Sequence, residues 1–179
     1  MTLLTTLRTM WKDWGFAQAV YGQAKHFLDL AKGSQNPTDK DGYVRAAFVF
    51  FVISFEAHFY EVVRGFIQAH RPSVAPQELR RVEDELKRNI GMQKAVREWP
   101  QRLTGRSLDT QGPLFTELIK VIEYRNWLVH GKIAQTVPSW RKLAQEIETT
   151  ENAERAGETV AAMVAQVSQH FGFETPHWS

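Results

Sequence analysis

The chain has 179 residues, of which 43% are hydrophobic and 23% are charged, and its formal net charge is only +2. These values are typical of one globular domain with a buried core, and they exclude a protein that binds nucleic acid through its overall charge. The chain has no cysteine, which excludes disulfides and thiolate metal sites.

The N-terminal segment MTLLTTLRTMWKDW does not have the pattern of a secretory signal, because no basic start is followed by an apolar run and a cleavage site. The most apolar stretch, residues 46–55, has ten residues, whereas a membrane-spanning helix needs roughly 20. We therefore expect a cytoplasmic protein with no membrane segment.

Helical periodicity dominates the first half of the chain. A first helix is predicted over about 16–32, and a loop rich in Gly, Pro, Asn and Asp follows over 33–42. A long second helix is predicted over about 43–69, ended by Arg71-Pro72. Its first half is apolar on every side, so we expect a second copy of the protein to cover part of it. Its main stripe consists of Phe48, Val52, Phe55, Phe59, Val62 and Phe66.

Residues 73–112 are predicted to be a basic helical insert, with a charged helix over about 76–90, shorter helical pieces over 93–99 and a final loop. Eight Lys or Arg residues stand against four acids between Arg80 and Arg106. One interpretation is a surface that binds an RNA backbone. The alternative, which we prefer, is a solvated helix face whose charges Glu83, Asp84 and Glu85 partly cancel. The candidate RNA-binding residues are Arg80, Arg81, Lys87, Arg88, Arg97, Arg102 and Arg106.

A third core helix is predicted over 113–130, with Gly131 as its stop. A final helical region is predicted over about 139–171, with a break near 149–152, before Gly172 and a loose tail over 172–179. The whole chain thus predicts a single all-α domain, a bundle of four to five main helices with its core over about 16–171.

The third helix places an arginine on its apolar face. At about 100° per residue, the apolar side chains Leu114, Leu118, Val121, Ile122, Leu128 and Val129 fall on one side, and Arg125 projects into the middle of them. Trp127, Lys120 and Glu123 point the other way. Burying an unpaired charge is costly. Either a buried carboxylate from another helix must therefore pair with Arg125, or the apolar face must open onto a cleft at this position. Glu56, midway along the second helix, is the predicted partner.

Asn126 and His130 lie four residues apart and therefore stack on the flank of the same stripe. His130 is in the last turn, where the helix dipole favours a protonated imidazole. Arginine can hold and neutralise a phosphate, and histidine can transfer a proton. The three residues Arg125, Asn126 and His130 are therefore candidates for phosphoryl-transfer chemistry. No pattern in the sequence requires a metal or a cofactor.

Arg-Asn followed by three residues and His-Gly, at the end of a bundle helix, resembles the motif of the HEPN superfamily of helical ribonucleases and nucleotide-binding domains. The segment FVFFVISFEAHF in the preceding helix is also similar to HEPN nucleases of bacterial toxin and phage-defence systems. The likeness covers about residues 43–171. A second match to the spacing, from Arg64 to His70, does not fit, because Arg64 points away from its helix's stripe and glycine follows it.

The resemblance implies a homodimer in which two motif helices share one cleft, and an endoribonuclease that needs no metal. The RNA 2′-hydroxyl would attack the adjacent phosphate, Arg125 would stabilise the transition state, His130 would transfer the proton and Asn126 would orient them. The implied role is a toxin or anti-phage effector, restrained by an antitoxin or another regulatory partner protein.

Two alternatives stay open. One is a non-catalytic module of the same fold that binds a nucleotide or RNA, or a protein partner. The other is a purely structural interaction domain, in which Arg125 and Glu56 form an internal ion pair and His130 caps its helix.

Overall fold

The computed structural model describes residues 15–88, 90–130, 147–176 and 178, and every regular element in these ranges is a helix. The chain-order helices are α2 (Phe16–Gly33), α3 (Pro37–His70), the short 3-10 helix η1 (Arg71–Ser73), α4 (Pro76–Arg88), α5 (Met92–Thr104), α6 (Pro113–His130) and α8 (Thr150–Phe171). The all-α prediction is confirmed in the described part of the chain. The predicted helix residues 139–146 and the Gly131 stop lie outside it.

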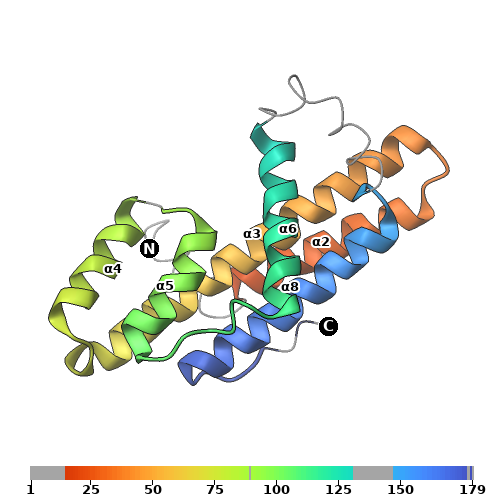
Figure 1. Cartoon of the computed structure of the whole chain (residues 1–179). Coiled ribbons are helices and arrows are strands. Elements are labelled where there is room, and N and C mark those ends of the chain that lie inside the picture. The colour runs from red at the N-terminus through yellow and green to blue at the C-terminus, as the bar shows by residue number, and fades with distance from the viewer. Residues whose placement is uncertain (1–14, 89, 131–146, 177, 179) are drawn as a thin grey trace, which may run out of the picture.

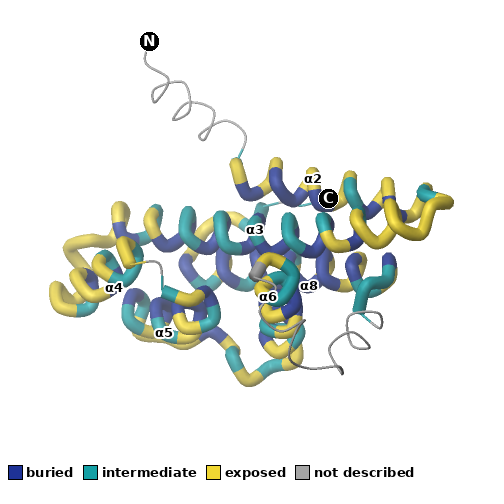
Figure 2. Tube along the Cα trace, turned by 90° about the horizontal axis from the view of Figure 1, so that it is seen from above, coloured by how far each residue is buried: buried dark blue, intermediate teal, exposed yellow. Residues whose placement is uncertain are grey.

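The long helix α3 is the axis of the fold (Figure 1). α2 and α8 run alongside it, α6 crosses it, and α4 and α5 form a pair near its C-terminal end. Figure 2 shows the buried residues of α3 concentrated on the side that meets α5, α6 and α8. The predicted stripe of α3 is confirmed, since its members are buried except for Phe66, which is partly buried.

Helix α3 begins at Pro37, whereas the loop was expected to extend to residue 42. The Asn36 side chain accepts a hydrogen bond from the Thr38 backbone N–H at 3.0 Å, and Pro37 occupies the first helical position, where it has no N–H to leave unpaired. The same Asn and Pro residues that suggested a loop are therefore the start signal of the helix.

The insert over 73–112 is more than an appendage, because it contributes to the main core. α5 is longer than the predicted 93–99 piece and continues through Pro100. Trp99 of α5 is fully buried and stacks on Phe59 of α3, with the ring centroids 5.9 Å apart. This packing fixes the α4–α5 pair against α3 and places α5 opposite part of α6.

Helix α6 has the predicted bounds, but its apolar face differs at the C-terminal end. Leu118, Val121 and Ile122 are buried, as predicted, whereas Val129 is 54% exposed. Trp127, expected to point away from the core, is partly buried and stacks on Tyr124. The physical reason is the crossing geometry: α6 rises away from α3 and α8, so its last turn extends beyond the packed layers (Figure 1).

The tail after Gly172 is held more firmly than its sequence suggested. Trp178 packs on Tyr21 of α2 and on His58 of α3, with ring centroids 4.9 and 5.5 Å apart. His58 is itself buried and hydrogen-bonds Ser168 of α8 at 2.9 Å, as a satisfied core histidine does. Trp178 is therefore a described residue of the tail that contacts the helical core, and the loose tail stays a prediction for the other residues.

Within residues 37–73, the structure has one helix that is long and apolar enough to cross a membrane by length and composition, with a mean hydropathy of 1.6 in its most apolar window. In this structure 56% of that window is buried inside the protein. The core helix of a soluble protein can have the same length and composition.

α8 packs against Phe51 of α3 at Gly157, a position where a side chain would collide. A Cβ added at Gly157 would lie 2.7 Å from Cζ of the buried Phe51. We expect Gly157→Ala to destabilise the protein by about 1–3 kcal/mol, because a packed core strains to admit an extra methyl group. Thermal unfolding measures this as a lower Tm. The matched control is Gly22→Ala on an exposed, open site of α2, where the better helix propensity of alanine predicts an unchanged or higher Tm. Equal shifts in the two variants would contradict the described packing.

Candidate functional site

Arg125 and Glu56 meet where α6 crosses α3. Arg125 Nη2 donates a hydrogen bond to Glu56 Oε1, so the predicted ion pair is present. The two side chains are only 15% and 26% exposed. Arg125 Nε is buried without a hydrogen-bond partner among the described residues. The guanidinium is therefore fixed by Glu56, and only its exposed part, not the buried Nε, is available to a ligand.

The local sequence explains why this arginine has a fixed direction. Leu118, Val121 and Ile122 anchor the preceding turns of α6 in the core, and Arg125 follows on the same face. On α3, Glu56 is one residue after the fully buried Phe55, and therefore lies beside the core rather than in it. Two rigid, well-packed helices thus determine where the pair sits.

Burial dominates the electrostatics of the Glu56–Arg125 pair. Burial raises the pKa of the Glu56 carboxyl above its ordinary value, and the charge and hydrogen bond of Arg125 oppose this shift without cancelling it. The guanidinium therefore does not fully offset the desolvation of the carboxylate. A partly buried pair with a perturbed pKa beside a cavity is a common feature of functional sites.

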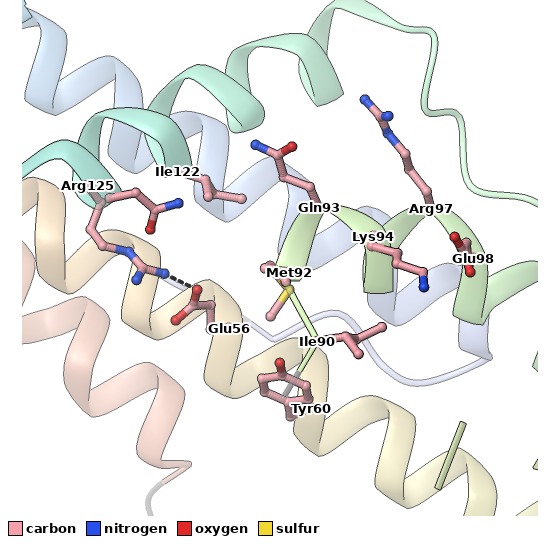
Figure 3. A pocket seen from close by; sticks show the side chains of 12 residues that line it. Glu56, Tyr60, Ile90, Met92, Gln93, Lys94, Arg97, Glu98, Ile122 and Arg125 are labelled. Atoms are coloured by element: carbon pink, nitrogen blue, oxygen red, sulfur yellow. Dashed lines mark hydrogen bonds and ion pairs between the residues drawn. The ribbon is translucent and has the colours of Figure 1, made fainter. Parts of the chain in front are cut away.

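Arg125 lies in the wall of a cleft of about 680 Å³. Its walls come from three helices, as Figure 3 shows: Glu56 and Tyr60 from α3, Ile122 and Arg125 from α6, and residues at the start of α5. Asn126 is exposed and also lines the cleft. The volume falls within the range of small-molecule sites, roughly 300–1,000 Å³, so a nucleotide-sized group fits.

The structure brings together Arg125, Asn126 and the supporting Glu56, as the sequence suggested. α6 includes residue 130, so the backbone places His130 one turn beyond Asn126. The side chain of His130 lies outside the described residues. The site is therefore defined here by its arginine, its amide and its carboxylate.

The basic stretch over 80–106 does not form one surface toward this cleft. Of its seven candidate residues, Arg97 lines the cleft. Arg102 is only 13% exposed and binds Glu85, Glu98 and Glu78, which makes it a structural residue of the α4–α5 pair and corrects its assignment to an RNA surface. The other five candidates do not line the cleft. Arg81 and Lys87 form ion pairs with Glu85 and Asp84. Arg80 and Arg106 donate hydrogen bonds to the backbone carbonyls of Pro76 and His170, and Arg88 is exposed at the end of α4.

Apart from Arg97, sequence reasoning did not single out the α5 side of the cleft, which also includes Gln93, Lys94 and the preceding Ile90. Gln93 Nε2 donates to Glu123 Oε1 of α6 at 3.4 Å, which ties the two walls together. No local signal marks these residues, since their position depends on α5 folding back along α3. Tyr60 had a signal, because it lies four residues after Glu56 and so on the same face of α3.

The arrangement can bind an anion and stabilise negative charge that develops on it, because a fixed and partly exposed guanidinium lines an open cavity. In the described part of the chain, no group of three or more His, Asp or Glu side chains is placed to hold a metal ion. Comparison with protein-family models, curated proteins and solved structures finds no match to this chain.

Proposed function

We propose that the protein is a metal-independent endoribonuclease that cleaves RNA at the cleft containing Arg125. The observation that carries the proposal is a partly buried guanidinium that is held by Glu56 and lines an open cavity. A charge retained in an apolar stripe without full compensation is costly, and a phosphate ligand supplies a reason for it.

The proposed reaction is an internal transfer at phosphorus. A base removes the proton of the RNA 2′-hydroxyl, and its oxygen attacks the adjacent phosphate. The bond from phosphorus to the 5′-oxygen breaks, and an acid protonates this leaving oxygen. The products are a 2′,3′-cyclic phosphate and a 5′-hydroxyl. Arg125 stabilises the extra negative charge of the five-coordinate phosphorane, His130 transfers a proton, and Asn126 orients the phosphate.

We further propose that the active form is a homodimer in which two α6 helices share one composite site, so that two histidines supply the base and the acid. The exposed Val129 and the partly buried Trp127 and Leu128 near the end of α6 support this, because apolar groups there would gain cover from a second copy. From the resemblance of the Arg125 motif to that of HEPN nucleases, we also propose a cytoplasmic toxin or anti-phage effector that is restrained by a partner protein.

Incubation of the purified protein with mixed RNA in excess EDTA tests the proposal. We expect cleavage that EDTA does not reduce, with products that carry 2′,3′-cyclic phosphate and 5′-hydroxyl ends. RNA that is bound but stays intact at every protein concentration would instead favour a non-catalytic RNA-binding module. Neither binding nor cleavage would favour the structural interpretation of the ion pair.

A further inference from the structure

The wall of the cleft opposite Arg125 has a chemistry of its own. It is formed by the start of α5 and the residues just before it, and Figure 3 shows Lys94 and Arg97 on this side, away from the Glu56–Arg125 pair. Both cations come from the face of α5 that turns away from the buried Ala95, Val96 and Trp99. The core packing of α5 therefore presents them to the cleft.

The charges of the cleft do not cancel. Its two carboxylates each bind an arginine, since Glu56 pairs with Arg125 and Glu98 pairs with Arg102. Lys94 is half-exposed, and its Nζ is 3.9 Å from Glu85, a carboxylate already bound by Arg102 and by the Trp99 indole N–H. Arg97 is exposed and lies over the Phe115 ring, and no carboxylate of the described residues is within ion-pair distance. Lys94 and Arg97 thus give the cleft a surplus of positive charge.

Apolar groups lie beside these cations. Tyr60 and Ile90 are half-buried in the same cleft, and Met92 lies next to them (Figure 3). The Tyr60 ring packs on Trp99, with centroids 5.9 Å apart, which holds it in place. A fixed aromatic ring next to surplus cations is the combination that binds an unpaired base together with its phosphate.

We propose that the α5 side of the cleft is a subsite for the nucleotide next to the cleaved bond, and that it selects single-stranded RNA. The inference rests on the proposed function, because it takes the phosphate at Arg125 as the reacting one. The flanking phosphate binds Lys94 and Arg97, and the flanking base packs against Tyr60 and Ile90. A base in a duplex is stacked and paired, so it cannot enter this site.

RNA binding measured in a His130→Ala background, where RNA stays intact, tests the phosphate contacts. We expect Lys94→Gln/Arg97→Gln to weaken binding of a labelled single-stranded decamer about tenfold. We also expect the slope of log affinity against log salt to become less steep by about 1.4, or about 0.7 for each lost contact. The control is Lys87→Gln/Arg88→Gln, which removes the same charge from the exposed end of α4 and should change neither quantity. Lys94→Arg/Arg97→Lys keeps the charges and should retain the salt slope, which guards against a folding defect.

The base contact is tested with decamers that carry one abasic nucleotide, moved along the strand. We expect one position at which the abasic nucleotide weakens RNA binding about tenfold. In a protein that also carries Tyr60→Leu, the abasic nucleotide at the same position should weaken binding clearly less, because the contact between base and ring is already lost. A duplex of the same sequence should bind more weakly than the single strand.

The outcomes separate this inference from the proposed function. Equal losses in the α5 variant and the α4 control would overturn the subsite, because binding would then depend on diffuse charge. Cleavage by a Lys94→Gln/Arg97→Gln protein with an unchanged KM would also overturn it, while the nuclease proposal stood. RNA that binds through these residues but is never cleaved by the wild-type protein would overturn the nuclease and leave the subsite in place.

Discussion

Arg125→Ala should reduce the rate of RNA cleavage by at least 10²–10³-fold, the approximate effect of removing one group that stabilises transition-state charge. The reason is geometric: among the described residues that line the cleft, Arg125 is the arginine whose guanidinium is fixed by an ion pair with another residue of the cleft. The measurement is the single-turnover rate on a labelled RNA at saturating protein, which separates the chemical step from weaker binding.

Arg64→Ala is the matched control for this change. Arg64 has nearly the same spacing to a histidine, His70, but it is exposed on α3 and does not line the cleft. We expect the Arg64→Ala variant to cleave RNA at the wild-type rate. If the Arg125 variant retained the wild-type rate, or if both variants lost activity equally, the assignment of the site would be wrong.

Arg125→Ala should also lower the free energy of unfolding, and more so at pH 7 than at pH 4. Burial already raises the pKa of Glu56, and the charge of Arg125 opposes that shift. When Arg125 is replaced by alanine, the Glu56 carboxylate stays desolvated and has lost its opposite charge. A carboxyl whose pKa is raised by folding stabilises the protein below its unfolded pKa, and that stability is lost as the pH rises through the folded pKa. At pH 7 we expect a loss of about 1–3 kcal/mol, between the values for exposed and buried ion pairs. Urea unfolding at the two pH values measures it.

The double variant Glu56→Gln/Arg125→Ala distinguishes stability from function. The neutral amide has no charge to desolvate, so we expect the variant to regain most of the lost stability and to lose the extra pH dependence of Arg125→Ala. It should remain inactive, because the guanidinium is still missing. Recovery of activity together with stability would mean that Arg125 acts only through the fold.

The ion pair could be predicted from the sequence because both of its members break a local pattern. Arg125 interrupts an apolar stripe, and Glu56 interrupts the most apolar segment of the chain, so the two helices had to bring them together or expose them. The bounds of α6 were equally accessible, because Pro113 marks its first residue and helical periodicity continues from there to His130.

The far wall of the cleft could not be predicted in the same way. Trp99, Lys94 and Arg97 lie in a charged segment whose local pattern fits a solvated helix. Their roles follow from Trp99 packing on Phe59, a contact between residues 40 positions apart that no local periodicity encodes. The exposure of Val129 was missed for a related reason, because a helical wheel shows the direction of a side chain but not where the neighbouring helix ends.

Wild-type protein and His130→Ala, incubated side by side with the same RNA in excess EDTA, show whether the protein is a metal-independent nuclease. We expect the wild type to produce fragments that end in 2′,3′-cyclic phosphate, and the variant to leave the RNA intact while it still binds it. An intact substrate in the wild-type reaction, or identical fragments from both proteins, would contradict the nuclease assignment.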